Sequence, residues 1–531
     1  MMSTILLQRS FSRLLCRALL LGATALISAC GSLPGVKEMP ATYAFKVDPS
    51  GDLAKIVTAS TPPGEHSGFR LMPLGVYSLD TRLELARRAK STLDVQYYVI
   101  ENDGAGRLLL RTLKEAAQRG VRVRLLVDDL HTARTERLLL ALGATPNIEV
   151  RLFNPFCCAR DQLAGRFVAS AFDFPRLNHR MHNKLFIADG VMAVAGGRNI
   201  ADEYFALKAA QNFIDMDALV VGQVMSELTA IFDAYWNSEE VYPVASIVQS
   251  PDARALIASD FDDAVDMAGP PTRLDLPPTD VLGYGPIGEE LSAGRVGFLW
   301  GRAMAVADPP HKLRSMTEAE ALATSVTMRV WGQLLAAESE VLMTSPYLVP
   351  GEKGMAAFEE LRQRGVALTL LTNSLAATDE PLVHTGYVRY RLRLLQAGVD
   401  LYELSPARTI RNKRPGLFGS SLGRLHAKTA VIDKRMMFIG SVNLDPRSAT
   451  KNTELGIMVD SPQLAREMLR IINISRLENA YRLRLVGTAR TIEWLTVDDD
   501  KEVVLSTEPE SSWFQRVYNR LLGTFVPESL L

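Results

Sequence analysis

Apolar residues recur with helical and strand periods in the same order in two distant parts of this chain. In the first part the pattern predicts helix 79–90, strand 93–100, helix 108–119 and strand 121–127. In the second part it predicts helix 317–337, strand 341–345, helix 355–364 and strand 366–371. The repeated order predicts an α/β fold of two lobes, each a mixed β-sheet flanked by helices, related by a pseudo-twofold axis.

A polar motif also occurs twice, once in each part. At equal offsets its members are His182, Lys184, Asp189 and Asn199 in the first copy and His426, Lys428, Asp433 and Asn443 in the second. The copies lie 244 residues apart (426 − 182), which is the size of a domain and far beyond that of a short structural repeat. We therefore expect two equivalent patches of side chains that meet at the interface between the lobes.

The local pattern predicts how each patch is built. The runs 185–188 and 429–432 are short, apolar and bounded by turn residues, which predicts strands. Each His and Lys lie two residues apart at the start of a strand, so both side chains are expected on one face, roughly 6 to 7 Å apart. Asp189-Gly190 is a hairpin signal, and Asp433-Lys434 a weaker one; either reversal would return the Asn to the same end.

These groups suit phosphodiester chemistry. Ammonium and amide groups can stabilise charge on the non-bridging phosphate oxygens without a metal ion. Imidazole can act as a covalent nucleophile and as a general acid or base near neutral pH. In-line displacement needs a group on each side of the phosphorus, which two facing patches supply. We expect no cofactor, and no spacing of His and Cys predicts a metal site.

The twin HxKxxxxD pattern with its Gly-rich Asn segment resembles the phospholipase D superfamily. The stretches 178–184, 373–379 with 383–387, and 527–531 resemble the bacterial C-type cardiolipin synthases within it. The resemblance implies a phosphatidyltransferase with a phosphohistidine intermediate, in which His182 is the nucleophile and His426 the general acid and base. It also implies phospholipid partners: phosphatidylglycerol, phosphatidylethanolamine or cardiolipin.

The resemblance further implies a carboxylate that orients each imidazole, and the chemistry asks for one because it fixes the tautomer. Glu454 matches this position well; in the first lobe Asp215 is favoured, with Asp217 as the alternative. Asp189 and Asp433 belong to the catalytic motif, but they lie at turns, where Asp is common for backbone reasons.

The acceptor of the phosphatidyl group separates the candidate functions. A second phospholipid alcohol as acceptor makes a transferase, whereas water makes a phospholipase D that releases phosphatidic acid. A nuclease is disfavoured because the formal net charge is −1 and nucleic-acid binding usually needs a basic excess. A non-catalytic lipid-binding scaffold is disfavoured because both motif copies are intact.

The N-terminal pattern predicts export. Residues 1–29 combine a basic start, an apolar core and small residues before Cys30, which resembles a bacterial lipoprotein signal. The apolar run is about twelve residues, short of the twenty or so that span a bilayer, which disfavours a transmembrane anchor. Lipidation of Cys30 would attach the protein to a membrane of the bacterial cell envelope, facing the periplasm.

The chain is thus expected to contain a signal peptide (1–29), a tether rich in Pro and Gly (30–70), a first lobe (71–240), an inter-lobe connection (241–315), a second lobe (316–480) and a C-terminal hairpin and helix (481–531). His384 belongs to a helical stripe that either lines the substrate-binding site or faces the core. The insertion 155–181 either contacts the acyl chains of the substrate or is an ordinary packed loop. The apolar stripe of the last helix is expected to pack on its own domain, with a membrane interface as the alternative. The catalytic unit is expected to be a monomer.

Overall fold

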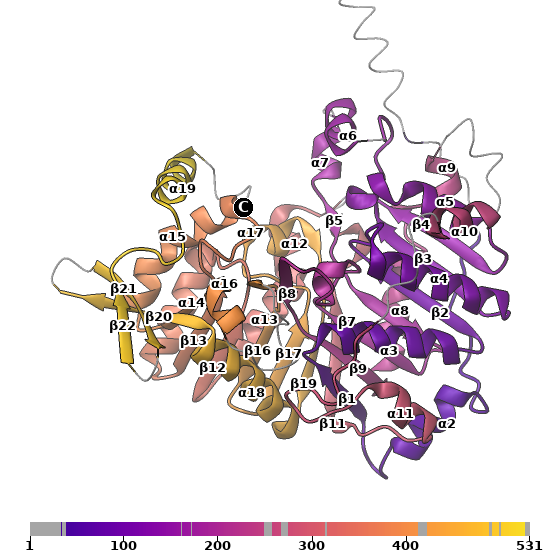
Figure 1. The fold of residues 1–531 in the computed structure, drawn as a ribbon, viewed down its shortest axis with the longest axis horizontal. Helices are drawn as coiled ribbons and strands as arrows, with labels where there is room; N and C mark the ends of the chain where they lie inside the picture. Colours follow the sequence, from indigo (N-terminus) through magenta and orange to yellow (C-terminus); the bar gives the residue numbers. More distant parts are fainter. Residues whose placement is uncertain are drawn as a thin grey trace, which may run out of the picture.

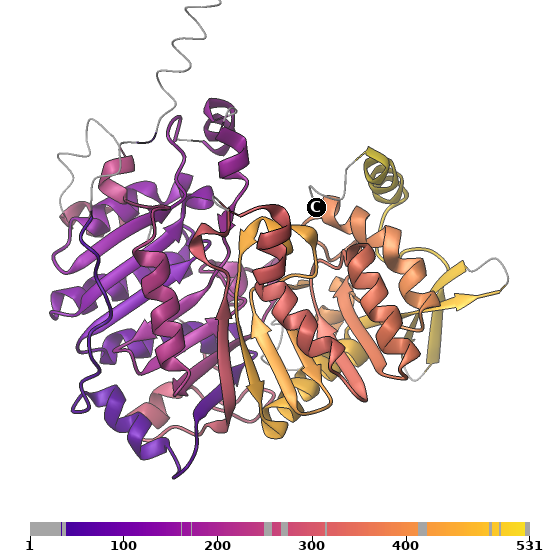
Figure 2. The same cartoon turned by 180° about the vertical axis from the view of Figure 1, so that it is seen from behind.

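The computed structural model describes residues 33, 39–160, 162–170, 173–248, 258–266, 274–313, 316–411, 422–487, 491–498 and 501–525. The predicted signal peptide, Cys30 and residues 527–531 lie outside this part. Two lobes lie side by side, the first in indigo to magenta and the second in orange to yellow (Figure 1; Figure 2 shows them from behind). Of the helices described, none combines the length and apolar character needed to cross a bilayer.

The first lobe is built on a mixed sheet. Its strands pair in the order β10 (Val241–Pro243), β4 (Ile148–Phe153), β3 (Arg122–Asp128), β2 (Thr92–Tyr97), β6 (Leu185–Ala188), β7 (Met192–Gly196), β9 (Asp217–Gly222) and β1 (Ser67–Met72). Strands β2, β3 and β4 are parallel, and the other pairings are antiparallel. The main helices are α3 (Gly75–Arg88), α4 (Gly104–Gln118), α5 (Glu136–Gly143) and α8 (Met225–Trp236).

The second lobe repeats this arrangement and extends it. Its strands pair in the order β11 (Leu299–Ala307), β19 (Leu455–Asp460), β17 (Met436–Gly440), β16 (Thr429–Ile432), β12 (Glu340–Thr344), β13 (Ala367–Asn373), β14 (Asp400–Leu404), β20 (Ala480–Val486), β21 (Thr491–Asp498) and β22 (Lys501–Leu505). Here β12, β13 and β14 are the parallel strands. The main helices are α14 (Gly351–Gln363), α15 (Pro381–Gln396), α18 (Pro462–Glu478) and α19 (Trp513–Phe525). The predicted α/β fold of two lobes is confirmed.

The two sheets join at the lobe boundary. Strands β1 and β11 pair antiparallel, with Gly68 opposite Trp300. A cluster of buried apolar side chains draws on both lobes and includes Phe69, Ile187 and Ile457. Because the lobes share hydrogen-bonded strands and a core, their relative position is fixed, and so is the distance between the two copies of the motif.

The single helix predicted over 317–337 is wrong: the structure has two helices, α12 (Glu318–Thr324) and α13 (Val326–Leu335). Between them Ser325 has an extended backbone, and its hydroxyl accepts a hydrogen bond from the Met328 N–H as the N-cap of α13. The apolar period runs on through this break, so periodicity alone did not reveal it. A Ser within the pattern was the available signal.

Parts of the predicted tether and connection are folded. Helix α2 (Asp52–Ser60) buries Leu53 and Ile56, and β1 begins within the segment assigned to the tether. Strand β11 falls within the predicted connection but belongs to the sheet of the second lobe. The frequent Pro and Gly residues around these short elements hid their apolar patterns. The other boundaries stay predictions.

Candidate active site

His182 is placed at the lobe interface by a short strand that pairs with the opposite lobe. Strand β5 (Arg180–Met181) lies parallel to β18 (Asn452–Thr453) of the second lobe. The backbone N–H of His182 donates to the Thr453 carbonyl oxygen at 2.9 Å. The next residue, Glu454, places a carboxylate oxygen 2.9 Å from Nδ1 of His182. A side chain of the second lobe therefore orients the imidazole of the first.

The second copy of the motif repeats this exchange in the other direction. Strand β15 (Leu422–Leu425) lies parallel to β8 (Gln211–Ile214) of the first lobe. The backbone N–H of His426 donates to the Ile214 carbonyl oxygen at 2.8 Å. The next residue, Asp215, places a carboxylate oxygen 2.5 Å from Nδ1 of His426. Each imidazole is thus held by the opposite lobe, and the site is complete only when the lobes are together.

The structure distinguishes the two candidate carboxylates of the first lobe. Asp215 contacts the imidazole of His426, whereas Asp217 pairs with the buried Arg82 at 3.0 Å. Asp217 also accepts a hydrogen bond from the Ser78 hydroxyl at 2.6 Å. Asp217 therefore belongs to the internal polar network of the first lobe.

The two motif lysines are buried and fixed by the backbone of their own motif. Lys184 Nζ donates to the His182 carbonyl oxygen at 2.6 Å, and Lys428 Nζ donates to that of His426 at 2.5 Å. Burial lowers the pKa of Lys184 well below its ordinary value and lowers the pKa of Lys428 to about 8. An anionic phosphate beside them would favour the charged form of both amines.

Asn199 and Asn443 have amide groups with unused capacity. Asn199 Nδ2 donates to the Tyr204 hydroxyl at 2.9 Å. The side-chain oxygen of each Asn is buried and has no hydrogen-bond partner in the part of the chain that the structure describes. An amide oxygen only accepts, so it would pair with a donor such as a substrate hydroxyl, whereas a phosphate oxygen would be bound by the amide N–H groups.

Asp189 and Asp433 each tie their hairpin turn to a neighbouring segment of the same chain. The Asp189 carboxylate accepts hydrogen bonds from the backbone N–H groups of residues 90–92. The Asp433 carboxylate accepts from those of residues 338–340 in the same way. These contacts give both residues a structural role, and a catalytic role for them rests on the motif alone.

His384 lies in the first part of α15 and is buried. Its Nε2 is 3.5 Å from a Glu508 carboxylate oxygen and 3.4 Å from the guanidinium of Arg391. These partners place His384 in a polar cluster between α15 and the C-terminal segment. Its role as a substrate wall stays a prediction.

Burial and the carboxylates together set the protonation of the imidazoles. Burial lowers the pKa of His182 to about 4, against the opposing effect of Glu454, and it also lowers the pKa of His426. Burial alone would raise the pKa of Asp215 and Glu454, but the adjacent imidazole and lysine bring each below its usual value. At pH 7 each imidazole is therefore neutral beside an ionised carboxylate. Its proton lies on Nδ1, which leaves Nε2 free to attack or to accept a proton.

Two tyrosines of the first lobe pack edge-on against the imidazoles. The rings of Tyr98 and His182 have centroids 5.1 Å apart, and those of Tyr204 and His426 lie 5.2 Å apart. The sequence pattern missed both tyrosines because neither belongs to the repeated motif. Tyr98 directly follows β2, and its place at the end of a central parallel strand was the available signal.

A buried cation supports the segment that carries each orienting carboxylate. In the first lobe, Arg198 donates to the Asp215 carbonyl oxygen at 2.5 Å and to the Met72 carbonyl oxygen at 2.9 Å. The matching position in the second motif copy is Val442, which can donate no such bond. The second lobe must therefore obtain its cation from elsewhere in the chain.

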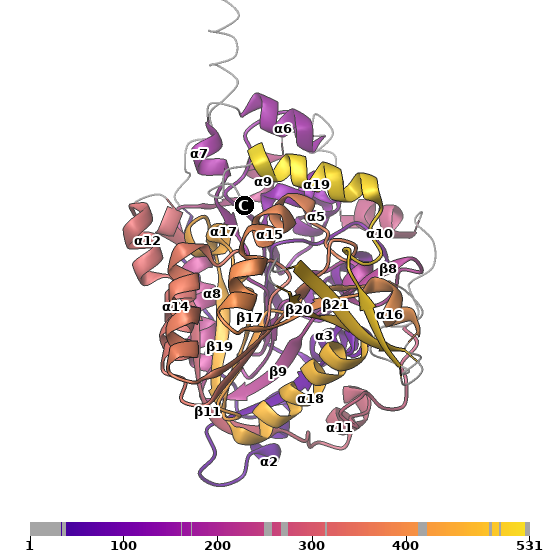
Figure 3. The ribbon, with the colours of Figure 1, turned by 90° about the vertical axis from the view of Figure 1, so that its left-hand side faces the viewer.

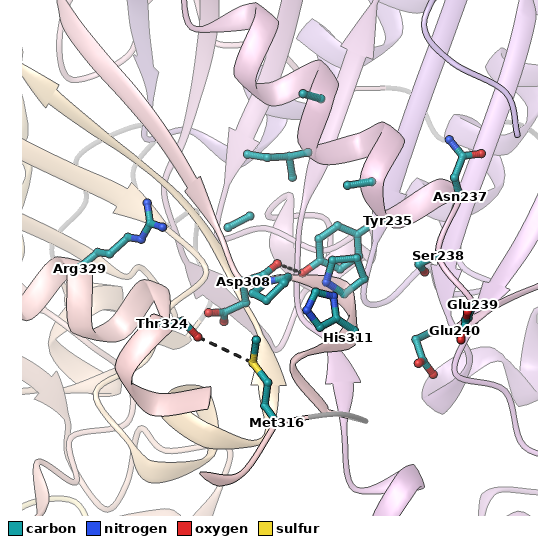
Figure 4. Close-up of a pocket in the computed structure, with 16 residues that line it drawn as sticks. Tyr235, Asn237, Ser238, Glu239, Glu240, Asp308, His311, Met316, Thr324 and Arg329 are labelled. Carbon is teal, nitrogen blue, oxygen red and sulfur yellow. Dashed lines mark hydrogen bonds between the residues drawn. The ribbon is translucent and has the colours of Figure 1, made fainter. Parts of the chain in front are cut away.

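Lys312 supplies that cation from the inter-lobe connection. Its Nζ donates to the Asn452 carbonyl oxygen and to the Asp308 carboxylate, both at 2.9 Å. The Asp308 carboxylate in turn accepts a hydrogen bond from the backbone N–H of Glu454 at 2.9 Å. Figure 4 shows that Asp308 lines a hollow of about 960 Å³. Tyr235 lies beside it, and its hydroxyl donates to the Asp308 carbonyl oxygen at 2.6 Å. The Asp308–Lys312 pair was missed by sequence because it lies far from either motif copy.

Comparison with known proteins agrees with this geometry. The family described as cardiolipin synthase, PLD-like domain, matches residues 83–236 and 331–474. Cardiolipin synthase C of Escherichia coli is 38% identical over 496 residues, which are 90% of this chain and 99% of the relative. An uncharacterized protein of Helicobacter pylori is 30% identical over 486 residues, covering 91% of this chain and 93% of the relative.

A solved structure shares the fold. The crystal structure of a phosphatidylserine synthase from Haemophilus influenzae matches with a TM-score of 0.54 at 14% sequence identity, covering 86% of this chain and 92% of that one. The resemblance that the twin motif indicated is confirmed. With both halves matched by the family, the chain belongs to the phospholipase D-like proteins of the cardiolipin synthase type.

Proposed function

We propose that this protein is a membrane-anchored phosphatidyltransferase of the cardiolipin synthase type. The observation that carries the proposal is the pair of imidazoles, each held by a carboxylate of the opposite lobe, at 2.9 Å and 2.5 Å. Two oriented imidazoles meet the need of in-line displacement for a group on each side of the phosphorus. The relative named cardiolipin synthase C supports phospholipid head-group diesters as substrates.

In the first step, Nε2 of His182 attacks the phosphorus of the donor phospholipid. A nitrogen–phosphorus bond forms as the bond between phosphorus and the leaving alcohol oxygen breaks. His426, protonated in the complex with the anionic diester, gives its proton to that oxygen and becomes neutral. The groups that stabilise charge on the non-bridging oxygens are Lys184, Lys428, Asn199 and Asn443.

In the second step, neutral His426 takes the proton from the acceptor hydroxyl. The acceptor oxygen attacks the phosphorus, and the nitrogen–phosphorus bond to His182 breaks. The Asp215 carboxylate beside Nδ1 of His426 would stabilise an imidazolium there, which supports the role of His426 as the acid. Such acid and base help is worth about 10²- to 10⁴-fold in rate.

The alternative is a phospholipase D, in which water replaces the acceptor alcohol at the same site. To separate the two, purified protein is incubated with isotopically labelled phosphatidylglycerol and unlabelled phosphatidylethanolamine, and the lipids are measured by mass spectrometry. Transfer yields cardiolipin that carries the label. Phosphatidic acid as the sole product would overturn transfer in favour of hydrolysis.

Variants of the two imidazoles complete this experiment. His182→Asn and His426→Asn are both expected to abolish turnover, and the matched control His311→Asn, an exposed residue outside the site, is expected to keep it. Unchanged lipid turnover in His182→Asn would overturn the proposed mechanism. Both imidazoles come from one chain, which supports a monomeric catalytic unit.

We also propose that Cys30 is the lipidated first residue of the mature protein, on the periplasmic side of a cell-envelope membrane. The proposal rests on the sequence of residues 1–30. Mass spectrometry of the mature N-terminus tests it. We expect an acylated Cys30, and an N-terminus that retains residues 1–29 would contradict cleavage.

A further inference from the structure

Helix α19 exposes much of its apolar stripe, unlike an ordinary surface helix. An amphipathic helix normally buries its apolar stripe and exposes its polar face. In α19 the polar Asn519 is only 6% exposed, whereas Trp513 is 70% exposed and Phe514 69% exposed. Tyr518 and Leu521 continue the exposed stripe, and the rings of Phe514 and Tyr518 are stacked. The expectation that this apolar stripe packs on its own domain is therefore wrong for these four side chains, whereas Val517 and Leu522 of the stripe are half-buried.

This orientation is fixed by polar contacts on the buried side of α19. The guanidinium of Arg389, in α15, donates to the Gly523 carbonyl oxygen at 2.5 Å. Gly523 lies so close to α15 that an added Cβ would be 3.3 Å from the Cβ of Thr385. Just before the helix, Glu508 accepts from Arg391 at 2.6 Å. The helix is thus held at both ends with its apolar stripe outward.

A second exposed apolar group lies at the same end of the molecule. Helices α6 (Leu163–Ala169) and α7 (Phe174–Leu177) expose Leu163, Val168 and Phe174. Figure 1 and Figure 3 both place α6, α7 and α19 at this end, together with β5 in Figure 1, the strand that leads into His182. The exposed apolar side chains of α19 and those of α6 and α7 therefore lie at the end of the molecule that carries β5, the strand before His182.

The charge of α19 indicates which kind of surface the helix would bind. Its sequence contains Arg516 and Arg520 and no Asp or Glu. Aromatic and aliphatic side chains on one face, combined with arginines and no acidic residue, are typical of helices that lie in the interface of an anionic bilayer.

We propose that α19, supported by α6 and α7, docks this enzyme onto the surface of an anionic phospholipid bilayer. The inference rests on the proposed function, since a lipid substrate must be reached from such a surface. Docking in this orientation places the end of the molecule that carries β5, the strand before His182, next to the bilayer. It does not depend on the lipid anchor at Cys30.

Vesicle binding tests the proposal. The mature chain carries Cys30→Ser, so that no acyl chain contributes, and its partition onto sucrose-loaded vesicles is measured by sedimentation. Vesicles of equal parts phosphatidylglycerol and phosphatidylcholine are compared with vesicles of phosphatidylcholine alone. We expect binding to the first kind, weakened by salt, and a fall of at least about tenfold when Trp513, Phe514, Tyr518 and Leu521 are all replaced by Gln.

The matched control is Leu477→Gln with Val497→Gln, which removes two exposed apolar side chains from α18 and β21. This control should bind vesicles like the parent. Turnover of a water-soluble short-chain phospholipid should be the same in parent, α19 variant and control, which excludes misfolding as the cause of lost binding.

Two outcomes would overturn the docking proposal. One is an α19 variant that binds vesicles as tightly as the parent. The other is a parent that elutes as a dimer and an α19 variant that elutes as a monomer, which would assign the stripe to a second copy of the chain. A protein that binds vesicles through α19 but turns over no phospholipid would instead overturn the proposed function.

Discussion

The ammonium of Lys312 lies 2.9 Å from the carboxylate of Asp308, and both side chains are fully buried. The pair holds the segment that presents Glu454 to His182. Replacing one partner leaves the other charge buried and uncompensated, which costs about 3 to 5 kcal/mol. We expect Lys312→Met to lower the free energy of unfolding in urea by this amount and also to lower kcat.

The controls for this prediction are a repaired pair and an exposed pair. Lys312→Met combined with Asp308→Asn should recover much of the lost stability, because no unpaired charge remains. Arg435→Met breaks the contact with Asp460, where Arg435 is 68% exposed, and should cost less than about 1 kcal/mol. A Lys312→Met protein as stable as the parent would show that the buried pair does not hold this segment.

The exchange of carboxylates between lobes gives a second prediction. Asp215→Asn and Glu454→Gln keep the size of each side chain but cannot stabilise an imidazolium at His426 or His182. We expect kcat to fall by about 10²- to 10⁴-fold in each variant, with the fold retained. Asp460→Asn, at a half-buried carboxylate that pairs with Arg435 outside the site, is the control. Full activity in Asp215→Asn would mean that this carboxylate does not assist His426.

The sequence predicted the parts of this site that repeat. Both motif copies lie where their strands and turns predicted. Even the weaker turn signal at Asp433-Lys434 forms the same type of turn, with φ of 51° and 52°. Its stability comes from the Asp433 carboxylate, which accepts N–H groups of a distant strand, and that contact cannot be seen in a local pattern.

The parts that the sequence did not predict depend on pairings between the lobes. Strands β5 and β18 are only two residues long, too short for any periodic signal, yet they set His182 beside Glu454. The choice between Asp215 and Asp217 also needed the register of β8 against β15, because a shift of one or two residues changes which side chain faces the imidazole.

Burial of the site predicts a bell-shaped pH dependence of kcat/KM, which reports on the free enzyme. Burial lowers the pKa of His182 to about 4, so activity should fall below this pH as the nucleophile is protonated. Burial also lowers the pKa of His426, so kcat/KM should first decline as this general acid loses its proton in the free enzyme. A second fall is expected above about pH 8, where Lys428 loses its phosphate-binding charge. The profile is measured with a water-soluble short-chain phospholipid.

The alkaline limb also has an internal check. The profile of kcat reports on the substrate complex, where the bound phosphate favours the charged form of Lys428. The alkaline limb of kcat should therefore lie at higher pH than that of kcat/KM. Coincident alkaline limbs would contradict the assignment of this limb to a phosphate-binding lysine.

Gly197 and Ser441 occupy the same position in the two motif copies, and each contacts an orienting carboxylate. A Cβ added at Gly197 would lie 2.1 Å from an Asp215 carboxylate oxygen, so that oxygen must move. Asp215 cannot move freely, because its other oxygen holds His426. Displacement of the pair by about 1 Å can cost on the order of 10²-fold in rate, so we expect Gly197→Ala to lower kcat by this order.

The control is Gly332→Ala in α13, where an added Cβ meets no atom within 4 Å. That change should leave kcat unchanged and raise the free energy of unfolding by up to about 1 kcal/mol, because Ala is more favourable than Gly in a helix.

In the second copy of the motif the Ser441 hydroxyl donates to Glu454, so there the side chain supports the carboxylate. Ser441→Gly should therefore lower kcat by loss of a contact, whereas Gly197→Ala lowers it by a clash. Unchanged kcat in Gly197→Ala would show that catalysis does not need Asp215 at its observed place.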